Sequence, residues 1–145
     1  MSGTPLQRAR EVAPILEANA QRAEDERTLP PESVAALVQA DLFRIALPRE
    51  LGGDEADFAT AIAVWKEIAR ADGSAGWTLM ANGSGAAAAS AYLSDDAVAK
   101  MFGGDPGATV GGQFAPRGTG LAEGGGYRVT GSYSFGSGSG HSRYV

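Results

Sequence analysis

The sequence predicts a mainly helical N-terminal bundle domain followed by the first strands of a β domain, an α+β arrangement overall. Before Gly103, apolar residues recur at the spacings of three and four that are typical of helices. After Gly103, short alternating runs are broken by glycine, and 14 of the 21 glycines lie between Gly103 and Val145. We therefore predict a helical domain over residues 1–103 and the start of a β domain over residues 104–145.

Two amphipathic helices are predicted in the first part of the chain. The first covers Leu6–Arg27 and contains Pro14, which we expect to kink the helix or to move its start. The second begins at Pro31, because the first turn of a helix tolerates proline. The apolar stripe of the first helix contains Leu6, Ala9, Ala13, Leu16, Ala20 and Ala23, and that of the second contains Val34, Leu37, Val38 and Leu42.

Three further helices are predicted before the glycine-rich part. The segment 57–72 has an apolar face that we expect to be buried, formed by Phe58, Ile62, Trp65 and Ile68 or Ala69. The segment 73–93 is apolar on almost every side and rich in small residues, which predicts a helix buried among others. Ser94 is a suitable N-cap for a short helix that ends at Gly103. These helices predict buried side chains at Phe58, Ile62, Trp65, Leu79 and Met80, and exposed ones at Glu24, Glu26, Asp95 and Lys100.

The glycine-rich part predicts strands. Residues 108–116 form a strand pattern interrupted by two glycines, and residues 123–135 predict a turn, a strand, a bend and more strand. The sequence then ends at Tyr144 and Val145, two residues that favour strands. A strand edge without a partner leaves unpaired amides and carbonyls, and isolated strands are marginally stable. We therefore expect a fragment of a longer protein; the alternative is a complete small domain with a frayed last strand.

Composition excludes several classes of protein. The chain has no cysteine and a single histidine, so it has neither a disulfide framework nor the ligands of a typical metal site. The net charge of −5 argues against a nucleic-acid partner. Neither a run of 18 apolar residues nor the apolar core of a signal peptide is present. These observations predict a soluble, cytoplasmic protein that does not bind a membrane.

Three motifs, in their order and spacing, resemble the N-terminal part of the acyl-CoA dehydrogenase superfamily. They are LPPESVAALVQADLFRIALPRELGG (29–53), ARADGSAGWTLM (69–80) and GGYRVTGSYSFGSGSGHSRYV (125–145). The resemblance covers essentially the whole chain and is strongest to the branch of flavin-dependent two-component monooxygenases. Members have an N-terminal helical domain, a middle β domain and a C-terminal four-helix bundle. The resemblance implies that this chain supplies the first domain and the opening strands of the second.

The resemblance also implies a function. A two-component hydroxylase would take reduced flavin, FAD or FMN, from a partner reductase and use oxygen to hydroxylate a small aromatic substrate. An acyl-CoA dehydrogenase, which oxidises the Cα–Cβ bond of an acyl thioester, is one alternative, and a non-catalytic helical interaction fragment is another. In both enzymes the catalytic residue would lie beyond Val145, so we expect the 145-residue chain alone to be inactive. The full-length parent is expected to be a homo-oligomer.

Two segments carry the implied flavin contacts. Phe135 and Ser137 stand where the family's strand passes beside the flavin ring, and the Ser137 hydroxyl and amide are expected near N5 and the C4 carbonyl. Gln113, Phe114 and Ala115 precede a proline where classical dehydrogenases carry a Thr-Glu-Pro pattern. The missing acidic residue favours the hydroxylase. Composition alone favours the alternative that the Gly/Ser run is an ordinary flexible loop.

Three further residues are candidates for the site. Polar residues on the helix that carries Trp77 and Asn82 border the substrate cavity in the hydroxylase branch, which makes both residues candidate substrate contacts. The alternatives are that Asn82 pairs with a backbone carbonyl and that Trp77 is a core residue. His141 stands where this branch often carries histidine; its alternative role is structural, at the start of a strand.

Overall fold

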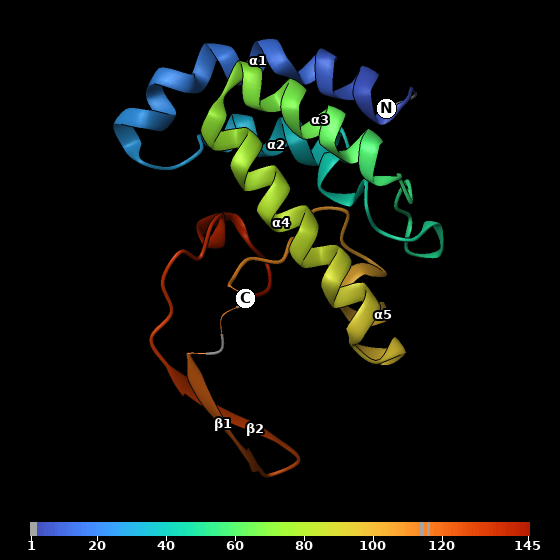
Figure 1. Ribbon diagram of the computed structural model, residues 1–145, viewed down its shortest axis with the longest axis vertical. Helices are drawn as coiled ribbons and strands as arrows, with labels where there is room; N and C mark the ends of the chain where they lie inside the picture. Colours follow the sequence, from blue (N-terminus) through green and yellow to red (C-terminus); the bar gives the residue numbers. More distant parts are fainter. Residues whose placement is uncertain (1–2, 114, 116) are drawn as a thin grey trace.

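The computed structural model describes residues 3–113, 115 and 117–145. The described chain contains five α-helices: α1 (Pro5–Glu26), α2 (Pro31–Gln39), α3 (Phe58–Ala71), α4 (Gly73–Tyr92) and α5 (Asp95–Phe102). Three short 3-10 helices are η1 (Leu42–Arg44), η2 (Arg49–Leu51) and η3 (Ser139–His141). The strands β1 (Gly118–Glu123) and β2 (Gly126–Gly131) form an antiparallel hairpin. In Figure 1, α1, α2 and α3 gather at the top, α4 runs down from them to α5, and the hairpin projects at the bottom.

Side-chain caps fix where the helices begin. Thr4 accepts a hydrogen bond from the Gln7 amide and forms a capping box with it, so α1 begins at Pro5. The helix then continues through Pro14, so of the two expected effects of this proline the shift of the helix start does not occur, and the kink stays a prediction. Pro14 lies on the exposed face, where water can satisfy the carbonyl that loses its partner. The predicted N-cap Ser94 is confirmed, because its side chain accepts from the Ala97 amide at the start of α5.

Asp72 joins α3 directly to α4. It ends α3, and its Oδ1 accepts from the amides of Ser74 (2.8 Å) and Ala75 (3.3 Å) at the start of α4. A connection of a single residue leaves little freedom between the two helices. The direction of α4 is therefore set by how α3 packs.

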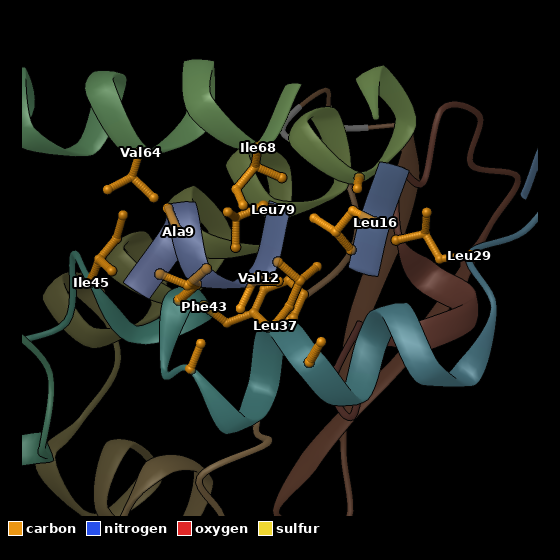
Figure 2. Packing of buried hydrophobic residues seen from close by; sticks show 14 of the residues in the cluster. Ala9, Val12, Leu16, Leu29, Leu37, Phe43, Ile45, Val64, Ile68 and Leu79 are labelled. Atoms are coloured by element: carbon orange, nitrogen blue, oxygen red, sulfur yellow. The ribbon is translucent and has the colours of Figure 1, made fainter. Parts of the chain in front are cut away.

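The main core lies between α1, α2, α3, η1 and the first half of α4. Figure 2 shows labelled side chains from these elements pointing toward one another, among them Leu16, Leu37, Val64, Ile68 and Leu79, none of which is exposed. A smaller cluster, which contains Leu47, Ala86, Val98, Phe102 and Ala108, lies between α5 and the second half of α4. Because α4 contributes to both clusters, its whole length is held in place.

The predicted inward face of α3 is only partly right, because Ile68 is fully buried as expected but Phe58 and Ile62 are not. Phe58 is 73% exposed and Ile62 is 38% exposed, whereas Trp65 is partly buried. The helix instead buries Ala61, Val64 and Ile68. Small and β-branched residues on that face let α1 and α4 approach α3 closely, while Trp65 packs against the edge of the core and Phe58 stays mostly exposed.

The predicted burial on α4 is partly right. Leu79 is fully buried, as expected, but Met80 is only partly buried, and Trp77 is 60% exposed, so its assignment to the core is wrong. The face of α4 that carries Trp77 is thus apolar without being buried in the main core. The predicted exposure of Glu24, Glu26, Asp95 and Lys100 is confirmed.

Strand structure is less extensive than predicted, although the α+β fold class is confirmed. The hairpin turns at Gly124 and Gly125, whose φ angles of 59° and 82° are those that a tight two-residue turn requires. In the segment 108–116, the described residues form only an isolated parallel bridge, between Val110 and Tyr144, and residues 132–135 form no strand. Every residue of β1 and β2 is exposed. A two-stranded hairpin that packs against nothing is only marginally stable, so it does not favour further strand pairing along the chain. The division at residues 103 and 104 stays a prediction.

None of the helices in the described ranges combines the length and apolar character needed to cross a bilayer. Among the described residues, no group of three His, Cys, Asp or Glu side chains is placed to hold a metal ion.

Candidate functional site

The loop of residues 136–140, here called the serine loop, folds back onto α4. Trp77 Nε1 donates a hydrogen bond of 2.7 Å to Ser137 Oγ, and Asn82 Nδ2 donates one of 3.0 Å to the Ser137 carbonyl oxygen. Trp77 and Asn82, predicted as substrate contacts, and Ser137, predicted as a flavin contact, are therefore one cluster. Ser137 is the residue on which both bonds end.

The backbone around Ser137 turns sharply. Phe135 and Gly138 have φ angles of 58° and 71°, and the Ser137 amide donates to the Phe135 carbonyl at 2.8 Å. A Cβ at Gly138 would lie 2.6 Å from both amide atoms of Asn82, so only glycine fits against that side chain. The Phe135 side chain is 91% exposed and does not join the cluster.

Asn82 is buried beneath the serine loop. Its exposed fraction is 1%, and its amide nitrogen pairs with a backbone carbonyl, which is the alternative role predicted for it. Its Oδ1 has no hydrogen-bond partner among the described residues. Asn82 therefore reaches a ligand only if the serine loop moves.

The second predicted segment lies beside the first. Gln113 Oε1 accepts from the Ser134 amide at 3.2 Å, and its Nε2 donates to the Ala115 carbonyl at 3.0 Å. Gly111 N donates to the Tyr144 carbonyl at 2.9 Å. Gln113 thus joins its own segment to the residues just before Phe135. Phe114, the other predicted flavin contact in this segment, lies outside the described residues.

Two hollows flank the serine loop. One, of about 730 Å³, is walled by small α4 residues and by Val129 and Tyr133, with Gln113 and Ser139 as polar groups. The other, of about 500 Å³, is more polar; its lining includes Thr28, Ser74, Thr78 and His141. Gly136 and Ser139 border both hollows. The site therefore has an apolar side and a polar side, and the serine loop lies between them.

His141 connects the serine loop to the α1–α2 connection. Its Nε2 lies 3.3 Å from Thr28 Oγ1, and its carbonyl accepts from Thr109 Oγ1 at 3.0 Å. Partial burial lowers the pKa of His141 below its usual value, which favours the neutral imidazole. These contacts give His141 a structural place at the edge of the site.

Sequence reasoning missed two close approaches to α4. A Cβ at Gly85 would lie 2.7 Å from the Val110 carbonyl oxygen, so this glycine allows the segment with Gln113 to approach the helix. Gly138 likewise allows the serine loop to pack closely against Asn82. A glycine inside a helix costs about 1 kcal/mol of stability relative to alanine, so its presence at a helical position suggests a packing reason. Gly85 in the middle of the predicted helix 73–93 was therefore the signal from which the close contact could have been predicted.

The family model described as the acyl-CoA dehydrogenase N-terminal domain matches residues 7–102. Among curated relatives, the oxygenase subunit HsaA of a flavin-dependent monooxygenase from Rhodococcus jostii is 32% identical over 140 residues. The oxygenase component of the FADH(2)-dependent resorcinol hydroxylase from a Rhizobium species is 31% identical over 131 residues. These matches cover 97% and 88% of this chain but only 36% and 31% of the relatives, so the chain spans about a third of their length.

Solved structures show the same likeness. XiaF from a Streptomyces species, in complex with FADH2 and glycerol, superposes with a TM-score of 0.89 at 30% identity, covering 95% of this chain and 35% of XiaF. The HsaA monooxygenase from M. tuberculosis superposes with a TM-score of 0.87 at 31% identity, covering 96% of this chain and 38% of its own.

Proposed function

Because this chain belongs to the acyl-CoA dehydrogenase family through the N-terminal domain at residues 7–102, we propose that it contributes to the flavin site of a two-component hydroxylase that acts on a small aromatic substrate. The observation that carries this proposal is the meeting of the two predicted flavin segments, through Gln113 and Ser134, beside an apolar hollow. The names of the relatives, a flavin-dependent monooxygenase and a resorcinol hydroxylase, support this choice of chemistry.

The residues of the site fit a flavin ring. The ring is flat and largely apolar with polar atoms along one edge, so it requires apolar walls and a few placed polar groups. The larger hollow offers such walls, and its volume of about 730 Å³ lies within the range of small-molecule sites. Gly136, which borders both hollows, has no side chain that would hold a ring away from the backbone.

We assign the polar edge of the flavin to Ser137 and to the backbone of Gln113 and Ala115. Phe114 and Phe135 complete the assignment as neighbours of that edge. A bound flavin supplies the redox chemistry, and the part of these residues is to orient it and to keep water away. Trp77 is our proposed substrate contact because its exposed indole offers a flat apolar surface next to Ser137. Asn82 is a substrate contact only in a state in which the serine loop has moved.

The proposal includes a partner and a setting. Reduced flavin would come from a separate reductase, because the FADH(2)-dependent relative is named as an oxygenase component, and we propose the cytoplasm as the setting. The FADH2 bound to XiaF favours FAD over FMN as the cofactor. A homo-oligomer stays a prediction for the complete enzyme.

A hybrid protein tests the proposal. In it, this chain replaces the matching N-terminal third of the Rhodococcus jostii relative, and flavin binding is followed by fluorescence titration. We expect the hybrid protein to bind FAD and, with a reductase and NADH, to convert a phenolic substrate in an oxygen-dependent reaction. The 145-residue chain should bind flavin weakly, because half of a pocket buries little of the ring.

Each alternative function predicts a different result for the hybrid protein. Oxidation of acyl-CoA without oxygen consumption would favour the dehydrogenase. A well-folded hybrid protein without flavin would favour a helical interaction module. Tight stoichiometric binding of flavin by the 145-residue chain would contradict the claim that its site is incomplete.

A further inference from the structure

We propose that Trp77 and Asn82 are positioning residues, which hold the serine loop on α4 and fix the Ser137 hydroxyl before any ligand binds. The inference rests on the proposed function for the identity of the ligand that Ser137 meets. It goes beyond that function because it gives both α4 residues a task that does not require contact with the substrate.

The contact between Trp77 and Ser137 has a defined polarity. An indole N–H only donates, so the Ser137 oxygen is the acceptor in this 2.7 Å bond. The hydroxyl keeps its proton and one lone pair, and both can serve a ligand. Because the two residues are 60 positions apart, the bond fixes the loop to the helix rather than stabilising a local turn.

Asn82 holds the backbone of the same residue. Its buried amide donates to the Ser137 carbonyl at 3.0 Å, and the Gly138 backbone lies directly against the amide atoms. A buried donor that loses its hydrogen-bond partner is destabilising, so the loop strongly prefers the position in which Ser137 accepts from Asn82. Close packing against the Asn82 amide also explains why residue 138 is a glycine, since a side chain there would clash with that amide.

The two bonds together prevent rotation of the loop. Trp77 and Asn82 are roughly 7.5 Å apart along the helix axis, given a rise of 1.5 Å per residue. Ser137 is held at its side chain by one residue and at its carbonyl by the other, so it cannot pivot about a single contact. Ser142 Oγ closes the turn from the far side with a bond of 2.9 Å to the Gly138 carbonyl. A loop ordered in this way loses less entropy when a ligand binds.

A spectrum of the 145-residue chain without ligand tests whether the loop is held. The two tryptophans, Trp65 and Trp77, give two indole N–H signals, which a Trp77→Phe variant assigns. We expect Ser137→Ala to shift the Trp77 signal and to speed its exchange with water, and to leave the Trp65 signal in place. Asn82→Ala should also speed the exchange at Trp77, because the loop loses its second anchor. If neither substitution changes the position or the water-exchange rate of the Trp77 signal, the proposal is overturned.

Flavin binding by the hybrid protein separates positioning from direct contact. Trp77→Phe and Asn82→Ala should each raise the Kd for FAD by about fivefold, the effect of one lost hydrogen bond. Trp77→Phe added to Ser137→Ala should raise it no further, because Trp77 acts through the hydroxyl. Ser132→Ala, an exposed serine before the loop, is the matched control and should leave the Kd unchanged.

The outcomes distinguish the two proposals. Independent, additive effects of Trp77→Phe and Ser137→Ala would mean that the indole touches the flavin itself, which overturns the positioning role. A Kd that responds to Ser137→Ala but to neither α4 substitution overturns the positioning role and leaves the proposed function standing. A hybrid protein that binds no flavin refutes the proposed function, and the indole spectra then decide whether the loop is held.

Discussion

Replacing Gly138 with alanine perturbs the serine loop at its closest approach to α4. The added Cβ would lie 2.6 Å from both amide atoms of Asn82, and the residue would keep a φ of 71°. For an L-residue the left-handed conformation costs about 1–2 kcal/mol. Displacing Asn82 leaves its buried amide unpaired, which costs about 1–3 kcal/mol. We therefore expect Gly138→Ala to lower the free energy of unfolding by about 2–5 kcal/mol.

Urea denaturation followed by circular dichroism measures this loss, and a second background divides it into its two parts. In an Asn82→Ala chain the amide is absent, so Gly138→Ala should cost only the backbone part, about 1–2 kcal/mol. Gly140→Ala is the matched control, because no atom lies within 4 Å of its added Cβ, and it should change stability by less than about 0.5 kcal/mol. Equal costs of Gly138→Ala in the two backgrounds would refute the reasoning, since the contact with Asn82 would then carry no energy.

Three further predictions concern the core, the flavin contact and pH. Leu79→Ala should lower the free energy of unfolding by about 3–5 kcal/mol, whereas Phe58→Ala, at a side chain that is mostly exposed, should cost well under about 1 kcal/mol in the same urea titrations. Ser137→Ala should weaken FAD binding by the hybrid protein by about 1–3 kcal/mol in fluorescence titrations, and an unchanged Kd would remove Ser137 from the site. Because burial lowers the pKa of His141 in the folded chain, the unfolded chain binds its proton more readily. Stability should therefore fall as the pH drops below about 6.5, the usual histidine pKa, and His141→Asn should reduce that fall in melts across pH.

Local signals predicted the helices well, because caps and proline positions act within a few residues. Ser94 and Pro31 mark helix starts that the structure confirms. The inward face of α3 was not predictable in the same way, since Phe58 and Val64 are both apolar and lie on different faces. The choice between these faces depends on how closely α1 and α4 approach, which no local pattern records. The burial of Arg8 could not be predicted for the same reason. This residue of α1 is buried because it forms an ion pair with Asp54, which is distant in the sequence.

The candidate site was predictable as a set of residues but not as an arrangement. The resemblance selected Ser137, Trp77 and Asn82 separately, and their meeting depends on contacts across 55 and 60 positions of sequence. The strands beyond Gly103 were overestimated because a strand pattern states only that a segment can pair. Whether it does pair depends on neighbouring strands, and the hairpin is exposed on both faces.

The placement of the main core has a consequence for the order in which the molecule assembles during synthesis. All its buried members lie between Ala9 and Leu79, so every partner has been made well before the serine loop is translated. At about 5–20 residues per second, the ribosome needs roughly 3–13 s to add the rest of the described chain. Helical cores form far faster than that. Residues 136–140 therefore emerge after every member of the main core has been made, and they pack onto a helix whose core partners are already present.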